Sequence, residues 1–246
     1  MALKVKTLKI ITILLFFSVL TFKVFSESNQ FVPFQTFSAD FQRETIENGE
    51  LLFTTGKIFF YKPYNVFIDV SEPLNQKMLI DSNLMLIYYP DENKGLKISS
   101  QEPLALPILS PFFSSTKSDF GLSIIGYSIK DYSMNSDTLS TKWSIPDQID
   151  DNSYFFEIKT VNNRIIEVLV SKAKKNLLIK RMIFSTYVEL SKELWIPQEL
   201  VIYDNENAGQ IVESIALKNI MLDIELPDSI LKFIIPENAE TEEIQW

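Results

Sequence analysis

Three glutamates, Glu44, Glu47 and Glu50, lie close together in the sequence and are the first candidates for acid–base chemistry. A pair of carboxyl groups can hydrolyse a glycosidic bond, but the two members of such a pair come from distant chain segments. Nothing in the sequence marks out such a pair, so we interpret these side chains as a solvated surface. The acidic run at residues 91–93 offers too few oxygen ligands for calcium and is typical of a hairpin turn.

The absence of two residue types narrows the chemistry further. The chain contains no cysteine and no histidine, which removes disulfides, thiol nucleophiles, the commonest general base and most transition-metal sites. It also contains no phosphate-binding glycine motif and no G-x-S-x-G nucleophile motif. Its net charge of −9 argues against nucleic acid as a partner. We therefore expect no metal, no cofactor and no enzymatic activity, and an enzyme that uses carboxylates alone is the least favoured alternative.

Residues 1–26 have the pattern of a secretory signal. Lysines precede the apolar run 10–20, and Ser26 is a small residue suited to cleavage before Glu27. An acylated bacterial lipoprotein would need a cysteine at that cleavage site, which this chain lacks. We predict that the signal peptide is cleaved and that residues 27–246 form a single domain in the periplasm.

The elements that follow are mostly strands. Residues 31–44 carry apolar side chains with i, i+3, i+7 spacing, which predicts a short amphipathic helix. Residues 101–120 are apolar, rich in serine and interrupted by three prolines, so they cannot be a central strand and predict one or two short helices over the sheet. Runs rich in β-branched and aromatic residues predict a mainly β (α+β) fold of about 10–11 antiparallel strands, forming a barrel or a strongly curved sheet. The runs are 51–61, 66–70, 77–80, 84–89, 153–160, 165–170, 177–186, 197–203, 210–219 and 231–235, with Trp143 on a further short strand.

The stretch at residues 56–70 is apolar on both faces of its two predicted strands. Ile58 and Phe60 share one face, whereas Phe59 and Tyr61 share the other. A strand with one solvated face would alternate apolar and polar residues. Two explanations remain open: helices cover the second face, or the concave face lines a cavity. A packed core without a cavity is the simpler alternative to the latter.

Four stretches of the sequence together resemble the LolA family of periplasmic lipoprotein carriers. Residues 37–42 (FSADFQ) resemble its motif F-x-A-x-F-x-Q, and residues 56–63 (GKIFFYKP) resemble G-x-L-x-F/V-K-R-P. Residues 79–90 (LIDSNLMLIYYP) resemble V-S-D-G-K-x-L-W-x-Y-x-P, and residues 233–236 (FIIP) resemble F-x-x-P-x-G-x-x-V. Each motif alone has low specificity, but their order and spacing match over most of residues 31–98 and 197–244.

The resemblance implies an open, strongly curved antiparallel half-barrel with a lid of short α-helices, to which residues 101–120 would belong. The concave face would then hold acyl chains. The residues expected to contact lipid are Ile58, Phe60, Val66, Ile68, Leu79, Leu86 and Tyr88, with Phe112 and Phe113 on the lid and Lys62 holding the lid closed.

The function implied by the resemblance is that of a carrier, not an enzyme. A member of the family shuttles acylated lipoproteins from the inner to the outer membrane, so the implied partners are an inner-membrane ABC-type release complex and an outer-membrane acceptor. We expect a monomer. A lipid- or glycolipid-binding protein, or a sensor of misplaced lipoproteins, is the main alternative on the same fold. An outer-membrane β-barrel is disfavoured, because residues 240–245 are acidic and lack an alternating apolar strand.

Overall fold

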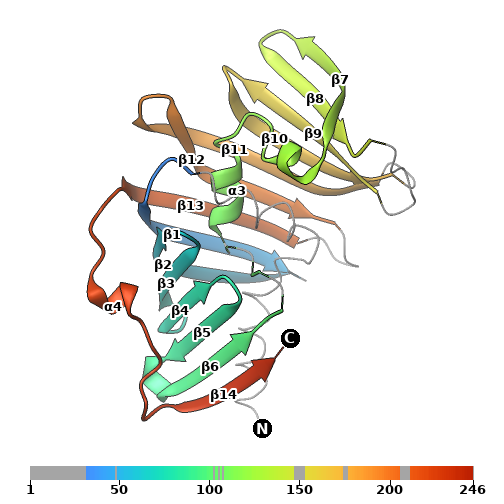
Figure 1. Ribbon diagram of the computed structural model, residues 1–246. Helices are drawn as coiled ribbons and strands as arrows, with labels where there is room; N and C mark the ends of the chain where they lie inside the picture. Colours follow the sequence, from blue (N-terminus) through green and yellow to red (C-terminus); the bar gives the residue numbers. More distant parts are fainter. Residues whose placement is uncertain are drawn as a thin grey trace.

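Strands dominate the part of the chain that the structure describes, and fourteen of them form one open sheet (Figure 1). The structure is a computed structural model and describes residues 32–47, 49–101, 103–104, 106, 108–146, 153–173, 177–205 and 211–245. The predicted signal peptide lies outside the described residues. The strands are β1 (Thr36–Glu47), β2 (Glu50–Tyr61), β3 (Asn65–Glu72), β4 (Gln76–Asp81), β5 (Leu84–Tyr89), β6 (Lys94–Ser99), β7 (Ser128–Asn135), β8 (Thr138–Ser144), β9 (Tyr154–Val161), β10 (Arg164–Lys172), β11 (Leu177–Ser191), β12 (Leu194–Asp204), β13 (Ile211–Leu222) and β14 (Glu240–Gln245). The helices are η3 (Pro90–Glu92), α3 (Leu109–Ser114), η4 (Leu122–Ile125) and α4 (Asp228–Leu231).

The order of the strands determines where the connecting chain must run. That order is β14-β6-β5-β4-β3-β2-β1-β13-β12-β11-β10-β9-β8-β7. From β1 in the middle, antiparallel hairpins lead outward to β6, and from β7 at the opposite edge they lead back to β13 beside β1. The exception is β14, which pairs parallel with β6. Two long connections therefore cross the sheet, one from β6 to β7 and one from β13 to β14.

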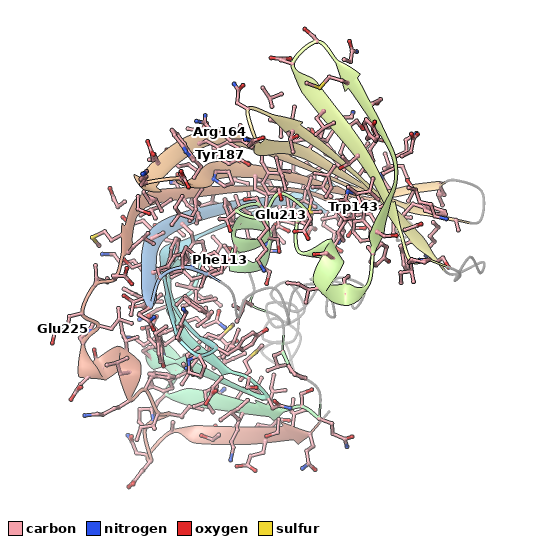
Figure 2. The ribbon with its side chains drawn as sticks, turned by 45° about the horizontal axis from the view of Figure 1, so that its top comes forward. Phe113, Trp143, Arg164, Tyr187, Glu213 and Glu225 are labelled. Atoms are coloured by element: carbon pink, nitrogen blue, oxygen red, sulfur yellow. The ribbon has the colours of Figure 1, made fainter. Side chains whose placement is uncertain are left out.

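The connection from β6 to β7, residues 100–127, runs over the concave face of the sheet. We call it the crossing segment. Figure 2 shows the sheet bending around its helix, α3. The buried apolar residues of the crossing segment belong to the same core cluster as the inward side chains of the strands, and they are Leu104, Leu106, Ile108, Leu109, Phe112, Phe113, Phe120 and Leu122.

The connection from β13 to β14, residues 223–239, runs over the opposite, convex face and carries α4 (Figure 1). There Phe67 of β3 packs with Leu226 and Ile230 in a second, smaller cluster. This cluster explains why residues 56–70 are apolar on both faces. Of the two explanations that the sequence left open, a helical cover accounts for the second face.

The prediction of a helix at residues 31–44 is wrong, because this segment contains the first part of β1. Side chains of Phe37, Ala39 and Phe41 are all buried in the main cluster, which is the two-residue period of a strand. Residues 37 and 41 are four apart, a spacing that fits both a helix and a strand. The small Ala39 between them carries the signal that decides in favour of the strand.

The predicted strand count was too low, and one predicted strand is wrong. Residues 231–235 do not form a strand; they follow α4 in an irregular segment. The strands missed are β1, β6, β7 and β14, which is the acidic run at residues 240–245. β14 lies at a sheet edge and is mostly exposed, so it has no row of buried apolar side chains. It is held to the sheet by backbone pairing with β6.

Candidate functional site

Four of the predicted lipid-contacting residues form a continuous wall on the concave face. Ile58 lies opposite Ile68, and Phe60 lies opposite Val66, across the β2–β3 pair. All four have no exposed surface and belong to the main cluster. The sequence therefore placed these side chains correctly on one face, and their contact with lipid stays a prediction.

The other three predicted wall residues, Leu79, Leu86 and Tyr88, lie on the opposite, convex face. Leu79 of β4 is opposite Phe67, and Leu86 is opposite Leu79, so these side chains point to the convex side. Leu79 packs against the small cluster there. Tyr88 shares the face of Leu86, and its phenol is hydrogen-bonded to Asn93.

Neighbouring residues take the concave positions of β4 and β5. Met78 and Ile80 are opposite Ile68 and Val66, and Ile87 and Met85 continue the same face. Since both faces of these strands are apolar, the amino-acid types do not reveal which set points inward. Only the register across the turns decides it.

Phe112 and Phe113 of α3 lie on the crossing segment over the concave face, and their role as lid residues stays a prediction. Phe113 is 1% exposed, and its ring centroid lies 5.3 Å from those of Phe34 and Phe37 and 5.2 Å from that of Phe60. The three contacts are edge-to-face, the arrangement that aromatic quadrupoles favour. Figure 2 shows Phe113 inside the bend of the sheet. Phe113 is therefore the side chain that joins the crossing segment to the centre of the concave wall.

Comparison with known proteins finds this architecture elsewhere. No protein-family model and no curated protein matches the sequence. A DUF1329 family protein from Desulfovibrio piger matches the structure with a TM-score of 0.56 at 15% identity, over 85% of this chain and 95% of that chain. A domain assigned to outer membrane lipoprotein sorting, from Vibrio parahaemolyticus, gives 0.54 at 10% identity, over 86% and 96%. A LolA superfamily protein from Nitrosomonas europaea gives 0.50 at 14% identity, over 85% and 95%.

This protein has a LolA-like fold. The resemblance that four short motifs indicated is thereby confirmed for the fold. The match extends over nearly the whole of each similar structure.

One side-chain hydrogen bond to the crossing segment of this LolA-like fold comes from a different residue than expected. Lys62 donates its backbone N–H to the Gln35 carbonyl at 3.0 Å, and its side chain has no hydrogen bond or ion pair among the described residues. Two residues further on, the buried Tyr64 phenol donates to the Leu104 carbonyl at 2.7 Å. The gating role of Lys62 stays a prediction. Sequence reasoning missed the hydrogen bond from Tyr64 to the crossing segment.

Phe34 and Phe37 were missed as well, because the prediction assigned them to a helix. Both lie against Phe113, and each has at most 1% of its surface exposed. The signal that could have found Phe37 is its alternation with Ala39 and Phe41 along β1. Phe34 precedes that strand, and no sequence pattern places it on the site.

The concave face of this LolA-like sheet is polar toward one end. Arg43 of β1 shares the face of Phe41, and its Nε lies 2.6 Å from Oε1 of the buried Glu213 of β13. Lys180 and Asp204 form a second pair at 3.0 Å on the neighbouring strands β11 and β12. Both pairs sit on the same alternation as the buried apolar residues, so any ligand along the concave face would meet hydrocarbon in the middle and charge at this end.

A phenol on the concave face has a pKa that burial shifts. Burial, with Glu92 nearby, raises the pKa of Tyr89 to about 12, so this phenol is neutral at physiological pH. Among the described residues, no group of three or more acidic side chains could hold a metal ion. No helix in the described ranges is long and apolar enough to span a membrane.

Proposed function

We propose that this protein is a periplasmic carrier that holds the acyl chains of lipoproteins on its concave face and takes them from the inner to the outer membrane. The observation that carries the proposal is the way this face is covered. A six-residue helix, α3, and its flanking chain lie over the wall, and Phe113 makes three ring contacts at its centre. Such a cover is small enough to be displaced as a unit.

The energies favour displacement by a lipid. Burying hydrocarbon gains about 0.8 kcal/mol per CH₂, so one sixteen-carbon chain gains about 12 kcal/mol on leaving water. Removing a buried phenylalanine from its contacts costs about 3–5 kcal/mol. A single acyl chain that takes the place of the Phe113 ring therefore gains about two to four times what the loss of that ring costs, and the other buried residues of the crossing segment add to the cost of displacement.

In this proposal α3 acts as a lid that is closed when no cargo is bound. The wall of Ile58, Phe60, Val66 and Ile68 would contact the acyl chains, and Tyr64 would give up its bond to Leu104 when the lid opens. A carrier must also release its cargo, so the closed state must be stable enough to compete with it. The self-packed cluster around Phe113 supplies that competition.

The partners follow from the same proposal. The monomeric carrier would receive lipoproteins from an inner-membrane ABC-type release complex, which would supply the energy of ATP, and would deliver them to an outer-membrane acceptor. The carrier itself would perform no enzymatic reaction. Free lipid, glycolipid or a sensed lipoprotein would use the same face, so the test must identify the occupant.

Site-specific photo-crosslinking tests the proposal in cells. We would place benzoylphenylalanine at Phe113 on the concave face and, as the matched control, at the buried Phe67 on the convex face. The Phe113 position should crosslink to acylated lipoproteins and not to a lipoprotein whose lipidated cysteine is replaced. The Phe67 position should give no such product.

Two outcomes would overturn the proposal. Equal crosslinking at both positions would show that the concave face is not the site. The second outcome comes from mass spectrometry of the protein purified from the periplasm. Detection of bound free lipid or glycolipid, and of no lipoprotein, would support the alternative lipid-binding function instead.

A further inference from the structure

A polar pocket lies beside the end of α3. Its volume is about 390 Å³, within the range of about 300–1,000 Å³ of small-molecule sites. Arg164 and Tyr187 lie close together in Figure 2. The residues that line the pocket are Ser115, Thr116, Asn162, Asn163, Arg164, Tyr187, Glu193 and Trp195.

Two hairpin turns and the end of α3 build the walls. Asn162 and Asn163 have φ values of 50° and 60°, the left-handed pair of a type I′ turn between β9 and β10. Glu193, with φ of 67°, occupies the turn between β11 and β12. Ser115 and Thr116 follow the last residue of α3 directly. The side chains therefore converge from three separate segments.

One cation is held in place over an aromatic ring. The guanidinium carbon of Arg164 lies 3.5 Å from the ring centroid of Trp195, a cation–π contact that fixes the plane of the group. Among the described residues, no carboxylate or carbonyl accepts a hydrogen bond from this guanidinium. Its N–H donors are thus positioned and available to a ligand in the pocket.

The hydroxyl groups of the pocket have already committed their protons. Ser115 donates to the Phe112 carbonyl and Thr116 to the Phe113 carbonyl, each at 2.7 Å, and the Tyr187 phenol donates to the Ile165 carbonyl. Burial raises the pKa of Tyr187, so this phenol keeps its proton at physiological pH. A hydroxyl has one proton and two lone pairs, so these oxygens keep some acceptor capacity, although part of it is used in the hydrogen bond between Ser115 and Tyr187.

This distribution of donors and acceptors selects the chemistry of the ligand. A phosphate or carboxylate would gain Arg164 but would face the Glu193 carboxylate and the hydroxyl lone pairs. A cation would face Arg164. A neutral polyol accepts from Arg164 and from the asparagine amides, and it donates its own hydroxyl protons to Glu193 and to the three oxygens.

We propose that the pocket formed by the end of α3 and the two hairpin turns binds a neutral sugar ring. The pocket is separate from the apolar wall, so this site stands whether or not the concave face carries acyl chains. The sugar could be a free saccharide or the headgroup of a glycolipid whose chains reach under α3. Maltose and dodecyl maltoside, used below its micelle concentration, distinguish these sources, because only the second offers an alkyl chain.

Nuclear magnetic resonance of the full chain tests the site directly. The probes are the methyl glycosides of glucose, mannose, galactose and N-acetylglucosamine, together with maltose, dodecyl maltoside and inorganic phosphate. At least one sugar should shift both the Trp195 indole N–H and the Arg164 Nε–H signals, and the shifts should saturate. Tighter binding of dodecyl maltoside than of maltose would identify a glycolipid headgroup, and equal binding would identify a free saccharide.

Variants connect the signals to the residues. Arg164→Met should weaken sugar binding about tenfold or more, the loss expected for a charge-assisted hydrogen bond. Asn163→Gly keeps the turn and removes one amide, so it should also weaken binding. Arg181→Met is the matched control, because Arg181 lies 5.9 Å from the Tyr203 ring but outside the pocket. Shifts with phosphate alone, no shifts with any sugar, or equal loss in the Arg181 variant would overturn the proposal.

Discussion

Truncation of Phe113 tests whether α3 keeps the concave face closed. The ring is 1% exposed and contacts three other rings at centroid distances of 5.2–5.3 Å. Replacing a buried phenylalanine with alanine costs about 3–5 kcal/mol, because the removed ring leaves a cavity. At about 2–4 °C per kcal/mol for a protein of this size, Phe113→Ala should lower the melting temperature by roughly 6–20 °C.

The assay measures this loss with and without hydrocarbon. We would follow thermal unfolding in the presence of a fluorescent long-chain fatty acid, which should occupy the space vacated by the ring. A ligand at one hundred times its Kd stabilises the folded state by about 2.7 kcal/mol. The fatty acid should therefore recover a large part of the lost stability, and the variant should bind it more tightly than the natural chain does.

Phe67→Ala is the matched control. Phe67 is 3% exposed and contacts Phe233 and Phe59 at 5.1 and 6.2 Å, but it lies on the convex face. This variant should lose stability in the same range and should not respond to the fatty acid. Equal rescue of both variants, or no rescue of Phe113→Ala, would refute the reasoning that the cover and a lipid compete for one site.

Three further predictions follow from particular contacts. Glu213→Ala breaks the buried ion pair with Arg43, so urea unfolding should show a loss of about 3–5 kcal/mol, and a loss near zero would contradict a stabilising role of the pair. Burial alone would raise the pKa of Glu167, but hydrogen bonds and charges from Lys159 and Arg181 lower it below its usual value. The ionised Glu167 carboxylate stabilises the folded state above about pH 4.3, and this contribution disappears as the pH falls through the lowered pKa. In a plot of unfolding free energy against pH, Glu167→Gln should therefore flatten the decline on the acid side. An unchanged decline would contradict the prediction. A Cβ at Gly56 would lie 2.2 Å from the Asp69 carbonyl oxygen, so Gly56→Ala should lose about 1–3 kcal/mol, and an unchanged urea midpoint would refute the close approach.

The sequence predicted strands best where apolar runs end at clear turn signals. The run 84–89 coincides with β5, bounded by a turn at residues 82–83 and by Pro90. Strands at the sheet edges were harder to predict. Both β7 and β14 are almost entirely exposed, so no apolar alternation distinguishes them from polar loops. The partner of β14 is β6, which is far away in the sequence, whereas β7 pairs with the adjacent β8.

The candidate site was predicted only in part, for a related reason. Along β2 and β3 the inward residues Ile58 and Val66 were assigned correctly, but along β4 Leu79 was chosen where Met78 and Ile80 point inward. Because α4 and its neighbours cover the convex side, both faces of β4 are apolar. A shift of one residue in the assumed register exchanges the two faces, and nothing in the strand itself reveals the choice.

The strand order explains why a cover exists at all. Since β6 lies beside one edge strand and β7 is the opposite edge, the chain between them must cross the whole sheet. It takes the concave side, where its apolar residues complete the core, and the six residues of α3 provide the central contact. The same helix ends at Ser115, which lines the polar pocket. If α3 moves as the proposed carrier function requires, the apolar wall and the polar pocket would change together, and a ligand bound at either place should alter the affinity at the other.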